Sequence, residues 1–161
     1  MPAGLRVTQE PVVADVIALP DAEATEDFGR KLAGRLRWGD VVALYGDLGA
    51  GKTTLARGLL AGLGFTGDVA SPTFPIVQAY DDLPIPLWHV DLYRIEDPEE
   101  LPELALDEAR SDAALVIEWP ERLGALLWPD ALRLHLTVAE AGARSLTAKV
   151  PPAWGDRWPP R

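Results

Sequence analysis

The stretch VVALYGDLGAGKTT, residues 41–54, decides how the rest of the chain is interpreted. Its first five residues form a compact apolar run, which is typical of a buried strand. Residues 46–53 then satisfy the spacing G-x-x-x-x-G-K-[ST], and apolar residues recur at helical spacing after Lys52 until Gly62 and Gly64. Strand, glycine-rich loop and helix therefore follow one another in the order that a phosphate-binding loop, or P-loop, requires.

The physical reason for this spacing is anion binding. Glycines let consecutive backbone N–H groups turn inward around an anion, at a helix N-terminus whose dipole already favours negative charge. Lys52 is placed to reach the β- and γ-phosphates of a nucleotide, and the Thr53 hydroxyl is placed to be one ligand of the Mg²⁺ that bridges them. A merely glycine-rich turn is the competing interpretation, but it does not require the flanking strand and helix.

Besides the hydroxyl ligand, a P-loop needs a carboxylate near the metal, at the tip of another buried strand. Glu118 follows the apolar run 113–117 and is our candidate Mg²⁺ ligand; the alternative is an ordinary surface glutamate at a strand end. Asp91 follows the apolar run 87–90 and is a candidate for orienting the attacking water or holding the water shell of the metal. A structural salt bridge is the alternative role for Asp91. His89 and His135 are interpreted as alternating strand residues and not as metal ligands, because each is isolated in the sequence.

The rest of the chain alternates strand and helix signals. Asp21 is a candidate helix N-cap, Pro102 is expected to split its segment into two short helices, and residues 81–84 are expected to join a hairpin. We expect residues 1–150 to form one α/β domain, a P-loop NTPase core with a mixed, largely parallel sheet flanked by helices. Residues 151–161, rich in proline and tryptophan, are expected to be an extended tail outside the core. The predicted strands are 11–18, 74–80, 87–92, 113–117, 132–136 and 145–150, and the predicted helices are 24–36, 98–110 and 122–127.

Composition narrows the class of protein. With 161 residues, 48% of them hydrophobic, the chain has the size and apolar content of one globular domain. It has no cysteine, which excludes disulfides, thiol nucleophiles and cysteine-based metal sites. Fifteen basic against twenty-five acidic residues leave a formal charge of −10, which disfavours strong direct binding to nucleic acid. No membrane span or secretory leader is recognisable, so a cytoplasmic protein is expected.

The sequence also bears on the kind of P-loop protein. GTPases of the common type select guanine with an N-K-x-D element, and this chain contains no asparagine. P-loop kinases of small molecules usually add a lid that carries arginines, whereas only Arg57 and Arg94 lie near the motifs here. Guanine specificity is therefore disfavoured, and a kinase lacks a supporting motif.

Four segments resemble one family. GDLGAGKTT (46–54), SPTFPIV (71–77), WHVDLYRIEDPEEL (88–101) and IEWPERL (117–123) occur in the order and approximate spacing of the bacterial TsaE family, also called YjeE. The resemblance spans about residues 21–145. It implies the ATPase component of the machinery that makes threonylcarbamoyladenosine, t(6)A37, on tRNAs that read codons beginning with A. It further implies binding of ATP or ADP with Mg²⁺, and slow, partner-dependent hydrolysis that resets a TsaB–TsaD transferase complex.

The resemblance implies a role for each matching residue. Thr53 and Glu118 match the Mg²⁺ ligands of the family, and Asp91 resembles a residue that the family needs for hydrolysis. Thr25 resembles a threonine near the adenine and ribose, and Thr73 is able to approach the γ-phosphate from a switch-type loop. The phosphate-cradling backbone corresponds to Gly49, Ala50, Gly51, Lys52, Thr53 and Thr54, and the expected catalytic residues are Lys52, Asp91 and Thr73.

Other positions match the family less fully. Trp119 and Pro120 match an element that the family associates with activity and partner contact. The family often has a basic residue directly after the glycine that corresponds to Gly142, whereas here Ala143 follows it and Arg144 comes one residue later. Two alternatives to the ATPase stay open: a regulatory module that binds nucleotide with negligible turnover, and a P-loop phosphotransferase that acts on a small molecule.

Overall fold

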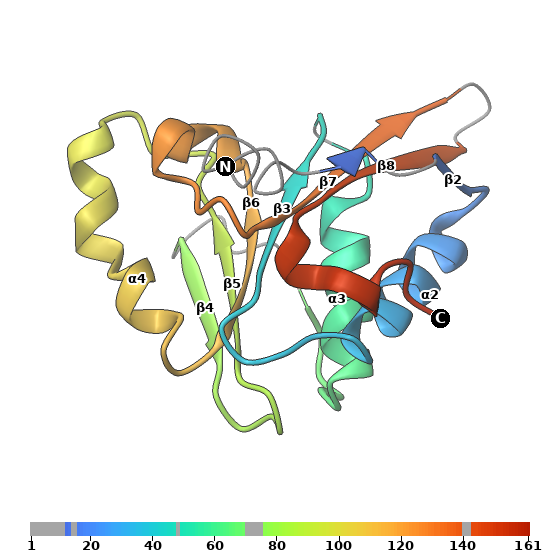
Figure 1. The fold of residues 1–161 in the computed structure, drawn as a ribbon, viewed down its shortest axis with the longest axis horizontal. Coiled ribbons are helices and arrows are strands. Elements are labelled where there is room, and N and C mark those ends of the chain that lie inside the picture. The colour runs from blue at the N-terminus through green and yellow to red at the C-terminus, as the bar shows by residue number, and fades with distance from the viewer. Residues whose placement is uncertain (1–11, 14–15, 48, 70–75, 140–142) are drawn as a thin grey trace, which may run out of the picture.

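The computed structural model describes residues 12–13, 16–47, 49–69, 76–139 and 143–161. Within them the chain forms one mixed sheet with helices on both faces (Figure 1). The strands are β1 (Val12–Val13), β2 (Ile17–Leu19), β3 (Val41–Tyr45), β4 (Val77–Tyr80), β5 (Leu87–Asp91), β6 (Ala114–Glu118), β7 (Leu132–Val138) and β8 (Arg144–Val150). The helices are α2 (Ala22–Ala33), α3 (Lys52–Gly62), α4 (Leu106–Ala109) and the 3-10 helices η1 (Pro98–Leu104), η2 (Pro120–Leu126) and η4 (Pro152–Arg157).

The sheet is parallel in its centre and antiparallel at both edges. Its strand order is β1-β8-β7-β3-β6-β5-β4, and β2 also pairs with β8. Strand β3 runs parallel to both β6 and β7, and β5 runs parallel to β6, whereas β4 and β8 pair antiparallel with their neighbours. The predicted P-loop fold with a mixed sheet flanked by helices is confirmed. Because the central strands are parallel, β3, β5 and β6 end at the same edge of the sheet. The P-loop motif follows β3 there, and the candidate carboxylates Asp91 and Glu118 are the last residues of β5 and β6.

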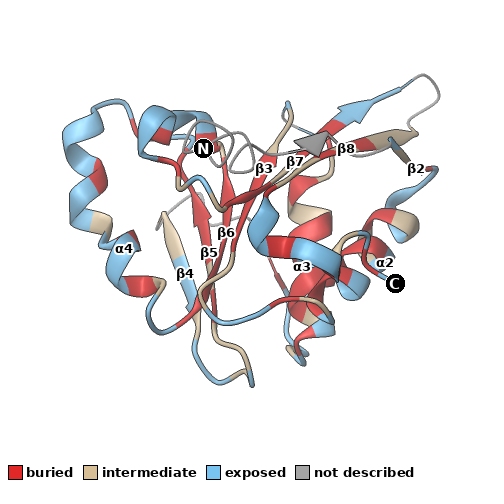
Figure 2. Cartoon of the chain, viewed as in Figure 1, coloured by how far each residue is buried: buried red, intermediate tan, exposed pale blue. Residues whose placement is uncertain are grey.

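Two apolar layers enclose this sheet. On one face, Val42 and Leu44 of β3 pack in a core cluster with residues of α2 and α3. On the other face, Val41 and Ala43 of the same strand pack with residues of η1, α4 and η2. Strand β6 is buried along its length and β3 is buried except at its last residue, Tyr45 (Figure 2), as expected for short, mainly apolar strands at the centre of a covered sheet.

Most element boundaries agree with those predicted from the sequence. Strand β3 has the predicted bounds, and Asp21 caps α2 by accepting a hydrogen bond from the Ala24 N–H at 2.8 Å. Strands β4 and β5 form the predicted hairpin. One prediction is wrong in detail: Pro102 lies inside η1, and the break before α4 falls at Ala105, whose φ of 53° is left-handed. Pro102 has no N–H to donate, but its carbonyl accepts the Ala105 N–H at 3.1 Å in the last turn of η1.

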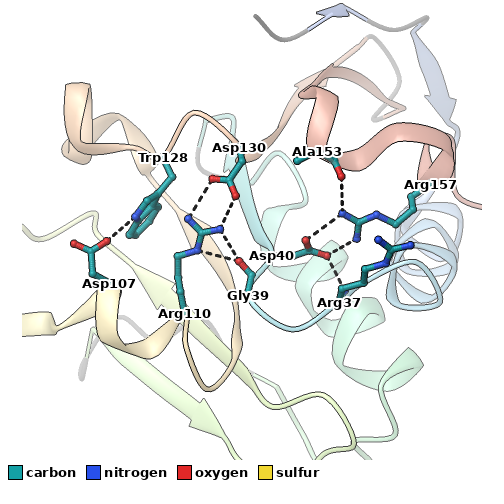
Figure 3. Close-up of polar contacts among 9 residues, drawn as sticks. All are labelled: Arg37, Gly39, Asp40, Asp107, Arg110, Trp128, Asp130, Ala153 and Arg157. Carbon is teal, nitrogen blue, oxygen red and sulfur yellow. Dashed lines mark hydrogen bonds and ion pairs between the residues drawn. The ribbon is translucent and has the colours of Figure 1, made fainter. Parts of the chain in front are cut away.

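The expectation of an extended tail over residues 151–161 is wrong. Residues 152–157 form η4, and Trp154 is only 1% exposed, inside the same core cluster as α2 and α3. The Trp158 ring packs edge-on against Phe28 at 5.9 Å between centroids. Arg157 pairs with Asp40 at 2.6 Å, and the Arg37 N–H donates to the same carboxylate (Figure 3). Burial of Trp154, partial burial of Trp158 and a paired, buried arginine outweigh the extended preference of the prolines.

In the described part of the chain, no helix combines the length and apolar character that a membrane crossing needs.

Candidate functional site

The P-loop backbone has the conformation that its glycines predict. Gly49 and Gly51 have φ values of 83° and 105°, which residues with a Cβ atom rarely adopt. Gly51 is also the N-cap of α3, so the helix begins without a capping side chain. The N–H of Ala50 turns inward to the Asp47 carbonyl at 3.0 Å, which closes the turn before the helix. The first turn of this 11-residue helix leaves backbone N–H groups without partners inside the helix, and P-loop proteins use such groups to bind phosphate.

A pocket of about 340 Å³ lies at this helix N-terminus. The structure brings together in it eight residues that the sequence singled out on three separate segments: Gly49, Gly51, Lys52, Thr53, Thr54, Asp91, Glu118 and Trp119. Tyr93, Arg94 and Arg144 complete the lining. Two predicted residues, Thr25 and Ala50, do not line the pocket, and Thr73 lies outside the described residues.

Thr53 and Glu118 form the candidate metal site. The Thr53 hydroxyl lies 3.5 Å from Oε2 of Glu118, which is the last residue of β6 and is buried. Elsewhere within the described ranges, and here too, no group of three or more His, Cys, Asp or Glu side chains is arranged to hold a metal ion. Hydroxyl and carboxylate oxygens suit Mg²⁺, which commonly takes its other ligands from water and substrate phosphates. The two residues present therefore fit Mg²⁺ bound together with a phosphate.

Asp91 lies beside this pair. It is the last residue of β5 and stands opposite Glu118 in the parallel register of β5 and β6. Its side chain is buried and accepts a hydrogen bond from the Tyr93 N–H at 2.9 Å, which fixes the carboxylate at the start of the following turn. The two candidate carboxylates therefore sit side by side at the edge of the sheet, as ends of parallel strands do.

The Lys52 side chain crosses the pocket between the loop and Trp119. Its Nζ donates to the Gly46 carbonyl at 2.6 Å and lies 3.9 Å from the centroid of the Trp119 ring. Burial lowers the pKa of Lys52 below its ordinary value, and the carboxylates of Glu118 and Asp91 partly offset that shift. The ammonium is thus partly desolvated and held among groups that favour its charged form, so a phosphate would meet a weakly hydrated cation.

Trp119 has a strained backbone and an aromatic neighbour. Its φ of 57° is left-handed, which is unusual for a bulky residue, and it forms the N-cap of η2 just before Pro120. The Tyr93 ring lies 4.9 Å from the Trp119 ring. The sharp turn directly after Glu118 therefore directs an aromatic side chain back over the P-loop lysine.

Thr25 and Arg144 flank the P-loop from other elements. A Cβ built at Gly51 would lie 3.6 Å from both the Thr25 methyl group and Nε of Arg144. The Thr25 hydroxyl bonds within its own helix, to the Asp21 carbonyl at 3.3 Å. Arg144 donates to the Gly49 carbonyl at 3.1 Å. Thr25 and Arg144 thus both lie beside Gly51, and of the two only Arg144 lines the pocket, where it adds a positive charge.

Sequence reasoning missed two contributors, His89 and Tyr93. His89 is fully buried in β5, and its Nε2 lies 2.7 Å from Oε2 of Glu118. Its position two residues before Asp91 was the available signal, because alternate residues of a strand share a face. Contact with Glu118 also depends on which strands are neighbours, and a single sequence does not specify that.

Comparison with known proteins identifies the family of this chain. A family model described as threonylcarbamoyl adenosine biosynthesis protein TsaE matches residues 19–146. A relative from Streptomyces coelicolor, named tRNA threonylcarbamoyladenosine biosynthesis protein TsaE, is 45% identical over 141 residues, which cover 77% of this chain and 95% of the relative. A protein of the same name from Bacillus subtilis is 39% identical over 126 residues, 78% of each chain.

A solved structure extends the likeness to the fold. The crystal structure of YdiB from Bacillus subtilis superposes with a TM-score of 0.76 at 30% sequence identity, and the match covers 89% of this chain and 90% of that one. With a family model that spans the P-loop, both carboxylates and the turn at Trp119, the chain belongs to the TsaE family.

Proposed function

We propose that this chain binds ATP with Mg²⁺ and hydrolyses it, as the ATPase of the machinery that makes t(6)A37 in tRNA. One observation carries the proposal: a lysine, a hydroxyl and two carboxylates converge in one pocket at the N-terminus of α3. That combination matches the needs of phosphoryl transfer, which depends on positioning and on stabilisation of phosphate charge. The relatives' names support the pathway.

The residues of the pocket have distinct roles in the proposed reaction. The backbone N–H groups of residues 49–54 cradle the phosphates, and Lys52 contacts the outer ones. Thr53 and Glu118 hold Mg²⁺, which supplies neutralising charge on the phosphate oxygens when it is bound. Asp91 accepts a hydrogen bond from the attacking water, which adds to the γ-phosphorus as ADP departs. We further assign Thr73 to the γ-phosphate and Thr25 to the adenine and ribose side.

The proposed partner is a TsaB–TsaD protein complex in the cytoplasm. A formal charge of −10 suits docking on a protein better than on a phosphate backbone, because like charges repel. ATP hydrolysis would then supply the free energy for a conformational reset of the transferase, while the transferase itself carries out the chemistry on tRNA.

Phosphate release tests the proposal. We would compare the wild type, Lys52→Ala and Asp91→Ala, each with and without purified TsaB–TsaD, and use Asp81→Ala as a matched control on the exposed hairpin turn. We expect both site variants to lose most of the partner-stimulated turnover, Asp91→Ala to keep nucleotide binding, and Asp81→Ala to behave as wild type. Equal release by the wild type and Lys52→Ala under every condition would rule out an ATPase at this pocket.

The same assay separates the two alternatives. Nucleotide binding with no turnover beside TsaB–TsaD would favour a regulatory module that uses the bound state for docking. Transfer of the labelled phosphate to a small hydroxylated metabolite, and not to water, would favour a phosphotransferase. Release of labelled inorganic phosphate in step with partner addition is the result that the ATPase requires.

A further inference from the structure

His89 contacts the candidate metal site without lining the pocket. It is fully buried, and its Nε2 lies 2.7 Å from Oε2 of Glu118. The same carboxylate oxygen lies 3.5 Å from the hydroxyl of Thr53. His89 is absent from the pocket lining, so a nucleotide in the pocket would meet Glu118 and Thr53 and not the imidazole. Any influence of His89 on a bound metal therefore acts through Glu118.

The contact joins two neighbouring strands at the centre of the sheet, β5 and β6. His89 lies in β5 opposite Val116 of β6, and Asp91 lies two residues further on, opposite Glu118. Both strands belong to the parallel centre of the sheet. Because backbone hydrogen bonds fix the register, the distance between the imidazole and the carboxylate is set by the sheet and not by a loop.

The chemistry of the pair selects one tautomer of the histidine. An ionised carboxylate only accepts hydrogen bonds, so Nε2 must carry the hydrogen that it donates to Glu118. The other ring nitrogen, Nδ1, is buried and has no hydrogen-bond partner within the described ranges. A buried carboxylate that receives a hydrogen bond from a fixed donor keeps one orientation, which is how residues behind a metal ligand tune metal affinity in other proteins.

We propose that His89 is a positioning residue for Mg²⁺ binding: its Nε2–H holds the Glu118 carboxylate toward Thr53, so that both oxygen ligands are oriented before the metal arrives. The inference rests on the proposed function, because it assigns His89 a role in the same site. It predicts that His89 affects the metal dependence of nucleotide binding and leaves metal-free nucleotide binding unchanged.

A magnesium titration of ADP binding provides the main test. We would measure the Mg²⁺ midpoint by calorimetry for the wild type, His89→Leu and His89→Gln, together with ADP affinity in EDTA. We expect His89→Leu to raise the Mg²⁺ midpoint about tenfold or more, the usual effect of losing a partner behind a metal ligand. Affinity in EDTA should stay within about twofold, since the nucleotide does not touch His89. His89→Gln, whose amide also donates, should recover most of the wild-type midpoint.

A matched control and a double-mutant cycle isolate the path through Glu118. His135→Leu removes the other strand histidine, which stacks on Tyr45 and lies in β7, separated from β6 by β3, and this variant should keep the wild-type midpoint. In a Glu118→Gln background, adding His89→Leu should change the Mg²⁺ midpoint by less than about twofold. Independent, additive effects of the two changes would overturn the proposal, and so would equal losses with Mg²⁺ and in EDTA.

The tautomer gives a readout that needs no metal and no variant. Long-range ¹H–¹⁵N spectra of the metal-free wild type should show His89 protonated at Nε2. Protonation at Nδ1 alone would contradict the hydrogen bond and with it the proposal, even if His89→Leu fails to fold.

Failure of the inference can be told apart from failure of the proposed function. If the wild type shows no Mg²⁺-dependent binding of ADP or ATP, both are refuted. If the wild type shows that dependence and His89→Leu retains the wild-type midpoint, only the role of His89 is refuted.

Discussion

At the scale of single residues, Lys52 shows most clearly how the fold positions a charged side chain in the pocket. The G-K-[ST] spacing predicted its role, but the contact with the Trp119 ring could not be predicted, because it depends on a left-handed turn after Glu118. Burial lowers the pKa of Lys52, with the nearby carboxylates opposing the shift. An arriving phosphate adds negative charge beside the ammonium and would move the pKa back up.

Nucleotide binding should therefore take up protons at alkaline pH. The pKa of Lys52 is below 10.5 in the free protein and rises when phosphate binds, so affinity should fall as the pH rises through the lowered value. Calorimetry at about pH 9.5 in buffers of different ionisation enthalpy measures the uptake. Lys52→Arg keeps a cation that does not titrate in this range and should abolish the uptake. Equal uptake by Lys52→Arg would show that another group is responsible.

His135 makes a second prediction, for stability. Burial lowers its pKa, Lys149 lowers it further, and Glu121 partly opposes the shift. The unfolded chain then binds a proton more readily than the folded one between the lowered value and 6.5, so the free energy of unfolding should fall as the pH drops below 6.5. Urea unfolding across this range should show a shallower pH slope for His135→Gln. An unchanged slope would assign the acid sensitivity to other groups.

At the scale of elements, α2 and α3 depend on glycines for their close approach. A Cβ built at Gly58 would collide with the Glu26 carbonyl oxygen, and one at Gly29 would collide with the Leu55 carbonyl oxygen. The helical periodicity predicted both helices from the sequence. The periodicity could not predict that the two backbones touch, because a glycine in a helical segment indicates only a weak helix former and not a close contact.

Gly58→Ala should consequently destabilise the fold by about 3 kcal/mol, the upper part of the usual range for overpacking. The matched control is Gly34→Ala at the C-cap of α2, where φ is −67° and the nearest atom to a new Cβ lies 3.4 Å away. We expect that control to change the free energy of unfolding by less than about 1 kcal/mol. Urea unfolding measures both, and equal effects would contradict the close packing.

The remaining elements show where prediction from sequence ends. Apolar runs predicted β3, β5 and β6 to within a residue or two, and the alternation of apolar and polar residues predicted β7, because these two patterns are typical of buried and of half-buried strands. The left-handed Ala105 was unpredictable, since alanine has no preference for that conformation. The role of Thr73 stays a prediction, because it lies outside the described residues.

At the scale of the whole molecule, the site and the C-terminal segment occupy opposite ends of β3. Arg157 binds Asp40, the residue before the strand, whereas the P-loop begins at Gly46, the residue after it. Figure 3 shows a second polar cluster near the same end, where Arg110 contacts both Asp130 and the Gly39 carbonyl. Composition indicated an extended tail, and only the three-dimensional packing reveals that residues 152–158 complete the core.

Trp154→Ala should therefore lower the free energy of unfolding by about 3–4 kcal/mol, as removal of a buried large aromatic does. Nucleotide affinity, measured well below the unfolding temperature, should stay within about twofold, because the two regions are separated by the length of the strand. Trp38→Ala, at a tryptophan that is 60% exposed, is the matched control and should cost much less. A loss of stability no greater for Trp154→Ala than for Trp38→Ala would contradict the burial of this segment.

Isothermal titration calorimetry of Mg²⁺-ADP into the wild type and Lys52→Ala tests most directly whether the pocket at the N-terminus of α3 holds a nucleotide. We expect saturable one-to-one binding by the wild type and an affinity about ten- to a hundredfold lower for Lys52→Ala, the range for loss of a charge-assisted contact. Absence of binding heat from the wild type at millimolar nucleotide, with or without TsaB–TsaD, would contradict a nucleotide site at this loop.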